Sequence, residues 1–114
     1  MSLSAPNLSE YRAVWLFAMF DLPVTDKKAR RAYTRFRKSL LKDGFTMIQY
    51  SVYARYCPTE EAGETYRRRV RHSLLDEGRV RLFSITDRQF GKMEVFDGKT
   101  RDKVEEPPSQ MLLF

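Results

Sequence analysis

The chain has 114 residues, of which 42% are hydrophobic and 13% aromatic, and these values predict one packed domain rather than a disordered chain. Its net charge of +6 favours an anionic partner, most often nucleic acid, although such a charge also serves solubility. A single cysteine, Cys57, excludes an internal disulfide and a cysteine-based metal cluster. With no membrane-spanning apolar run and no signal-peptide pattern, we expect a cytoplasmic protein that does not contact membranes.

The first predicted strand is an unbroken apolar run from Ala13 to Phe20, which Asp21 and a proline-marked turn follow. Residues 1–10 before it are expected to form a flexible arm. Alternate side chains of a strand lie on opposite faces of its sheet, so this run needs cover on both faces. Helices of the same chain can cover one face. We expect a second copy of the chain, in a homodimer, to cover the other.

A helix is predicted next, from a cap at Thr25 or Asp26 to about Asp43. Its apolar residues recur every three or four positions, which is one face of a helix. Gly44 is expected to end it. Two strands, 45–50 and 51–57, follow because these segments are rich in aromatic and β-branched residues.

A second helix is predicted from Pro58 to Gly78, with an inward face that includes Val70 and Leu74, and a strand over 79–86 follows it. Residues 39–44 and 73–78 resemble each other, and each segment precedes a strand. The chain therefore reads as two strand–helix–strand halves. This order predicts an α+β, ferredoxin-like βαββαβ domain over residues 11–90, with a four-stranded antiparallel sheet and both helices on one face.

Residues 91–114 are predicted to be a C-terminal extension. A helical turn over 87–93 leads into it, and a short strand and turn over 94–98 and a charged loop over 99–110 follow. The apolar end, residues 111–114, is expected to add a strand to a sheet edge, either of its own subunit or of the partner in a homodimer, and the alternative is a disordered tail.

Two basic clusters favour phosphate binding over an ordinary solvated surface. The first helix carries eight of the 21 lysines and arginines, against only two acids, and a second cluster lies over residues 67–71. Contacts of this kind position a nucleic acid without reading its sequence. The candidate binding residues are Lys27, Lys28, Arg30, Arg31, Arg35, Lys38, Arg67 and Arg68.

Asp21 is the candidate catalytic and metal-binding residue, because it is the acid at the end of the first strand. One carboxylate holds Mg²⁺ weakly, and a two-fold dimer would bring two copies of Asp21 together. The alternative is that Asp21 caps the following turn or helix, and the sequence leaves both interpretations open. His72 is expected near the end of the second helix, and Cys57 in the core.

Over residues 12–90 the chain resembles the small CRISPR-associated spacer-acquisition proteins of the Cas2 family. The resemblance is carried by the apolar strand ending in Phe20-Asp21, the basic helix, Gly44-Phe45, Gln49-Tyr50-Ser51-Val52-Tyr53, Arg81–Thr86 and Asp87-Arg88-Gln89-Phe90. It implies a ferredoxin-like homodimer, with a C-terminal strand that reaches across to the other subunit.

The resemblance also implies a function in CRISPR adaptation, in which the homodimer binds double-stranded DNA and bridges the larger CRISPR-associated integrase. It implies an alternative as well, an Mg²⁺-dependent endoribonuclease or endodeoxyribonuclease with Asp21 as metal ligand, acting on RNA or DNA. Basic residues are plentiful, whereas a two-metal nuclease needs several clustered carboxylates, so the sequence favours DNA binding.

Overall fold

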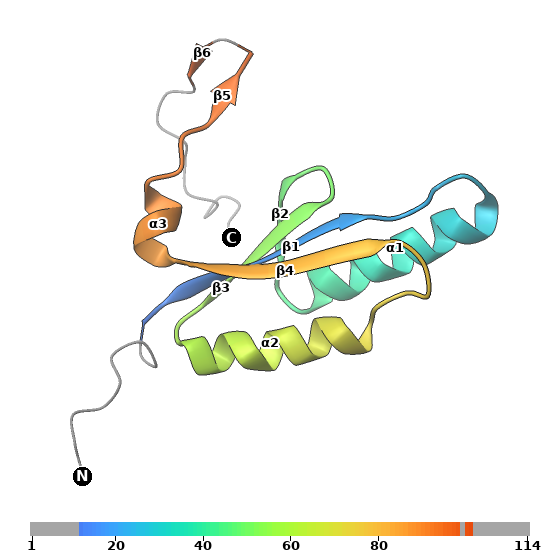
Figure 1. Ribbon diagram of the computed structural model, residues 1–114, viewed down its shortest axis with the longest axis horizontal. Coiled ribbons are helices and arrows are strands. Elements are labelled where there is room, and N and C mark those ends of the chain that lie inside the picture. Colours follow the sequence, from blue (N-terminus) through green and yellow to red (C-terminus); the bar gives the residue numbers. More distant parts are fainter. Residues whose placement is uncertain (1–11, 99, 102–114) are drawn as a thin grey trace.

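The computed structural model describes residues 12–98 and 100–101, and within them it confirms the predicted α+β, ferredoxin-like fold (Figure 1). Four strands form an antiparallel sheet in the order β2-β3-β1-β4, which places β1 in its interior. The elements are β1 (Val14–Asp21), α1 (Lys27–Lys42), β2 (Thr46–Gln49), β3 (Val52–Cys57), α2 (Glu60–His72), β4 (Arg79–Thr86), α3 (Asp87–Gly91), β5 (Phe96–Asp97) and β6 (Thr100–Arg101).

The hydrophobic core lies between the sheet and the two long helices, α1 and α2, which cover the same face of the sheet (Figure 1). Alternate residues of β1 point into it, and Leu16 and Ala18 have no exposed surface. Phe36 and Leu40 of α1 and Val70 of α2 pack against them, each 1% exposed. One face of the apolar first strand is therefore covered by helices of the same chain, as predicted.

The other face of the sheet, here called the open face, is partly covered by α3. The Phe90 ring stacks on Trp15 with centroids 3.9 Å apart, and Trp15 Nε1 donates a hydrogen bond of 2.8 Å to Asp87 Oδ1. Further along the face, Met19 and Phe83 remain 38% and 37% exposed. The expectation that a second copy covers this face is therefore corrected at one end, where the short helix that follows β4 packs on Trp15.

Helix α1 begins and ends as predicted. Asp26 is its N-cap, and the carboxylate accepts a hydrogen bond of 2.7 Å from the Ala29 backbone N–H. After the last helical residue, Gly44 adopts a φ of +89°, a left-handed conformation that a residue with a Cβ resists.

The predicted end of the second helix is wrong. Helix α2 ends at His72, where Ser73 donates its hydroxyl to the Val70 carbonyl, and Gly78 instead precedes β4. Leu74, predicted to face inward, lies in the loop and is 46% exposed. The two similar segments differ in charge, because Asp76 and Glu77 would stand at the negative end of the helix dipole if α2 continued.

Beyond β4, the predicted helical turn is α3, with a capping box between Thr86 and Gln89. The predicted strand and turn over 94–98 correspond to β5 and Gly98. The prediction of a charged loop over 99–110 is wrong at residues 100–101, which form β6 and pair with β5. The arm over 1–10 and the apolar end over 111–114 lie outside the described residues. None of the described helices is long and apolar enough to cross a membrane.

Candidate nucleic-acid interface

Asp21 is the last residue of β1, and its exposed side chain lies on the open face of the sheet. In the antiparallel pairing of β1 with β4 it stands opposite Arg79, and Met19 stands opposite Arg81. Directly opposite residues share a face and have Cβ atoms about 4.5–5.5 Å apart. Asp21 therefore has cationic neighbours on β4, and these guanidinium groups could attract a phosphate to the side of the carboxylate.

Sequence reasoning missed Arg79 and Arg81 as neighbours of Asp21. The signal was present, because these arginines alternate with Val80 and Leu82, which pack against the core. A period of two therefore places both arginines on the open face. What the sequence did not show is the register that sets them beside β1.

The backbone around Asp21 is fixed on both sides. Phe20 donates its N–H to the Ser51 carbonyl at 3.0 Å, and Leu22 is only 8% exposed. Gly78 packs so closely here that an added Cβ would lie 3.0 Å from the Asp21 carbonyl oxygen and 2.4 Å from Leu22 Cδ2. The N-cap of the following helix is Asp26, so Asp21 does not serve as that cap.

Among the described residues, no group of three or more His, Cys, Asp and Glu side chains could hold a metal ion. Within one chain, the donor set at the end of β1 is the Asp21 carboxylate. An oxygen ligand fits Mg²⁺, which keeps several of its waters when it binds to few carboxylates. The chemistry therefore fits a weakly held Mg²⁺, and a second Asp21 would strengthen it.

The cations of α1 fall into three rows around the helix axis, because successive residues turn by about 100°. One row, here called the outer row, points away from the sheet and is exposed: Lys27, Arg31, Lys38 and Lys42. The second row is Lys28 and Arg35, and the third is Arg30 and Arg37. Arg37 is partly buried and donates to the Tyr53 hydroxyl at 2.8 Å, so its role is structural.

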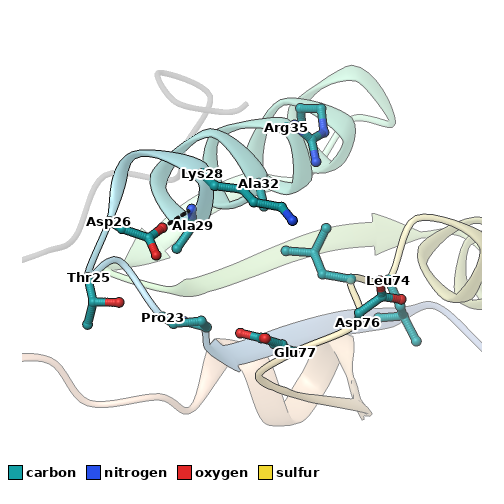
Figure 2. A pocket seen from close by; sticks show the side chains of 11 residues that line it. Pro23, Thr25, Asp26, Lys28, Ala29, Ala32, Arg35, Leu74, Asp76 and Glu77 are labelled. Carbon is teal, nitrogen blue, oxygen red and sulfur yellow. Dashed lines mark hydrogen bonds between the residues drawn. The ribbon is translucent and has the colours of Figure 1, made fainter.

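The second row lines a pocket of about 550 Å³ between α1 and the loop before β4. Figure 2 shows Lys28 and Arg35 on the helix facing the loop that carries Asp76 and Glu77. These carboxylates partly neutralise the two cations and would repel a phosphate. Lys28 and Arg35 are therefore weaker candidates for phosphate binding than the outer row.

The predicted second basic cluster is largely engaged within the chain. Arg69 forms an ion pair of 3.1 Å with Asp43, and Arg71 lies 3.8 Å from Glu64. Arg67 is partly buried and donates to the Ser84 hydroxyl at 3.0 Å. Arg68 is exposed, with a contact of 3.3 Å to the Thr65 hydroxyl. Of this cluster, Arg68 is the better candidate for nucleic-acid binding.

An exposed aromatic pair, which sequence reasoning also missed, lies at the same end of the sheet as Asp21. Tyr50, in the turn between β2 and β3, is 71% exposed, and its ring stacks on Tyr33 of α1 with centroids 6.1 Å apart. Hydrogen bonding with Tyr33 is the main cause that raises the pKa of the Tyr50 hydroxyl. The sequence feature that could have indicated this exposed ring is an aromatic residue, Tyr50, at a turn between two predicted strands.

The two remaining residues of interest lie where they were predicted. Cys57 is fully buried, and this burial is the main cause that raises the pKa of its thiol above the ordinary value. His72 is the last residue of α2 and is exposed. Neither residue lies at the end of β1.

A model of the family described as CRISPR associated protein Cas2 matches residues 14–93, from β1 to just beyond α3. A relative from Parvibaculum lavamentivorans, named CRISPR-associated endoribonuclease Cas2, is 50% identical over 89% of this chain and 100% of its own length. Relatives of the same name from Flavobacterium psychrophilum and Paracidovorax avenae are 43% and 41% identical, over 95% and 94% of this chain and 94% and 99% of theirs. The resemblance found in the sequence is thereby confirmed, and the chain belongs to the Cas2 family of CRISPR-associated proteins.

Proposed function

We propose that this chain is a metal-dependent endoribonuclease that acts as a homodimer and uses Asp21 as its metal ligand. The observation that carries the proposal is the position of Asp21, exposed at the end of β1 and opposite Arg79. The name endoribonuclease Cas2, given to the relatives, supports the same activity.

Arg79, Arg81 and Asp21 would have separate roles at the phosphodiester that is cleaved. Arg79 and Arg81 attract the phosphate and offset the negative charge that grows on its oxygens in the transition state. The two Asp21 carboxylates of the dimer would hold Mg²⁺, which when bound would supply charge neutralisation and a water of lowered pKa. Because Leu22 and Gly78 fix the backbone on one side, the carboxylate starts from a defined position.

The homodimer is needed because one chain supplies a single carboxylate. Its interface would be the part of the open face that α3 leaves uncovered, where Phe83, opposite Phe17, and Met19, nearer to Asp21, are exposed. Stacking this patch on its own copy would bury apolar surface, which stabilises the dimer by about 25 cal/mol for each Å² buried. The two-fold symmetry of such a dimer would bring the two Asp21 residues toward its axis.

A second candidate function is duplex binding and bridging of the CRISPR integrase during adaptation. The outer row of α1 favours it, because Lys27, Arg31 and Lys38 are exposed on a helix of 16 residues, about 24 Å long. Such a row follows the backbone of a DNA duplex and gives affinity that falls steeply with salt. The two functions use different surfaces, so one protein is able to carry both.

The test compares Asp21→Asn with Glu61→Gln, which removes a carboxylate at the other end of the sheet, in the first turn of α2. Cleavage of a labelled single-stranded RNA is followed with Mg²⁺ and with EDTA. Asp21→Asn should lose roughly 100-fold or more of the rate, as expected for a positioned catalytic group, while remaining dimeric. Cleavage by Asp21→Asn at the wild-type rate would refute the nuclease proposal.

The second candidate is tested with the triple variant Lys27→Gln, Arg31→Gln, Lys38→Gln. If all three contact phosphates of a duplex, the slope of log affinity against log salt falls by about 2.7. Unchanged duplex affinity and slope would refute the role of the outer row, whatever the result for Asp21.

A further inference from the structure

Tyr50 presents an aromatic surface to solvent. Its side chain is 71% exposed, more than the other large hydrophobic residues of the described part of the chain. Among the described residues, the Tyr50 ring stacks on the ring of Tyr33, with an interplanar angle of 18° and a centroid distance of 6.1 Å. A ring stacked on one neighbour and still this exposed keeps a π-face available for a further planar group.

The ring is held in place by its surroundings. Ser51, the next residue, accepts the Phe20 backbone N–H at 3.0 Å and shares a hydrogen bond of 3.1 Å with the Tyr33 hydroxyl. Ser51 has a φ of +63°, a left-handed conformation that disfavours residues with a Cβ. Such a conformation persists only where neighbours impose it, so the turn presents Tyr50 in a defined orientation. A preorganised ring loses little conformational entropy when a ligand binds.

Two arginines of α1 lie near Tyr33 along the helix. Arg30 and Arg37 lie three residues before and four residues after Tyr33, so one turn of α1 separates each of them from its ring. Arg30 is exposed, whereas Arg37 is held by the Tyr53 hydroxyl. An aromatic face beside cations suits a nucleobase attached to its phosphate, because bases stack on the ring and the phosphate meets the charge.

The aromatic pair is also close to the end of β1. Asp21 follows Phe20 and Tyr50 precedes Ser51, and Phe20 and Ser51 are joined by a backbone hydrogen bond. Tyr50 and Asp21 are thus each one residue away from the same backbone contact, but their side chains lie on different faces of the sheet, with Tyr50 against Tyr33 of α1 and Asp21 on the open face. A nucleic-acid strand that reached both would pass around the end of β1. We propose that Tyr50 is a stacking site for an unpaired nucleobase of the strand whose phosphate lies at Asp21. The position of that phosphate rests on the proposed nuclease function, whereas the stacking itself does not.

The test measures binding in EDTA, without cleavage, of the full chain to a single strand that carries 2-aminopurine and to the same sequence as a duplex. Tyr50→Phe keeps the ring, and Tyr50→Leu keeps an apolar side chain without a π-face. Met47→Ala, which removes another exposed side chain from the same hairpin, is the matched control. RNA and DNA versions of the strand distinguish the two sources of an unpaired base.

We expect Tyr50→Leu to weaken single-strand binding roughly 5- to 150-fold, the range for loss of one base–aromatic stack, with the change in 2-aminopurine fluorescence abolished. Tyr50→Phe and Met47→Ala should bind within about twofold of wild type, and duplex affinity should be unchanged in all three variants. A loss with RNA or with DNA supports the proposal and identifies the polymer. Unchanged binding of both by Tyr50→Leu would overturn it.

An equal loss for single strand and duplex, or dissociation of the protein dimer by Tyr50→Leu, would also overturn the stacking site, because the ring would then be structural. The nuclease proposal fails separately, by wild-type cleavage in Asp21→Asn. That variant should retain the 2-aminopurine signal, since it leaves the Tyr33–Tyr50 pair intact.

Discussion

Replacement of Gly78 by alanine should destabilise the fold strongly, because two independent costs meet at this residue. Its φ is +93°, and a Cβ there would lie 2.4 Å from Leu22 Cδ2 and 3.0 Å from the Asp21 carbonyl oxygen. The left-handed conformation costs a residue with a Cβ about 1–2 kcal/mol. Overpacking at such a contact costs about 1–3 kcal/mol.

Alanine also reduces the entropy of the unfolded chain, which offsets about 0.4–1 kcal/mol. We therefore expect Gly78→Ala to lower the free energy of unfolding by roughly 2–4 kcal/mol. For a domain of this size the midpoint of thermal unfolding should fall by about 8–16 °C. Far-UV circular dichroism during thermal and urea unfolding measures both quantities.

Gly44→Ala is the matched control. Gly44 has nearly the same backbone conformation, with a φ of +89°, but its added Cβ would meet the guanidinium of Arg55 at 3.2 Å. Since the end of a long side chain moves aside more easily than backbone does, the net cost should be the conformational one less the same unfolded-chain offset, about 0–1.6 kcal/mol. If Gly78→Ala lowers the free energy of unfolding no more than Gly44→Ala does, the close packing against Asp21 and Leu22 contributes nothing to stability and our reasoning is wrong.

The Arg55 guanidinium donates to the Asp43 carbonyl and the Tyr66 hydroxyl and lies 3.8 Å above the Tyr66 ring. Because one ammonium cannot replace these contacts, Arg55→Lys should lower the free energy of unfolding in urea by about 1.5–3 kcal/mol. A change below about 0.5 kcal/mol would show that this network is dispensable. Cys57 should react with a thiol reagent at pH 8 only as fast as the protein opens, since burial raises the pKa of its thiol, and mild denaturant should accelerate the reaction. Because this pKa is higher in the folded state, its stabilising contribution is present below the ordinary value of 9.0 and is lost as the pH rises above it. A Cys57→Ser variant should lose that pH dependence, and rapid labelling of the folded protein would contradict the buried thiol.

The local patterns of the chain predicted most elements of the fold. The cap at Asp26, the apolar spacing of α1 and the strand over 79–86 depend on neighbours a few residues apart, so they are visible in the sequence. The end of α2 differs from its prediction because the likeness of residues 73–78 to residues 39–44 does not extend to their charge. Asp76 and Glu77 oppose the helix dipole where Lys42 supports it.

The candidate site was predictable only in part. Asp21 stands out in the sequence because a carboxylate directly follows an apolar strand. Its neighbour Arg79 lies far along the chain, and only the register of β1 against β4 brings the two together. The cations of α1 likewise look alike in the sequence, whereas the structure leaves the outer row exposed and places Lys28 and Arg35 opposite acidic residues of the loop before β4.

By itself, the sequence determined the two strand–helix–strand halves, the basic surface of α1 and the exposed position of Asp21, because each follows from periodicity and local chemistry. Only the tertiary structure decided which side chains meet. Pairing of distant strands placed Arg79 opposite Asp21, packing of α1 on the hairpin joined Tyr33 to Tyr50, and α3 folded back over Trp15. Contacts of this kind depend on register and on the direction of the chain after each strand, which no local pattern encodes.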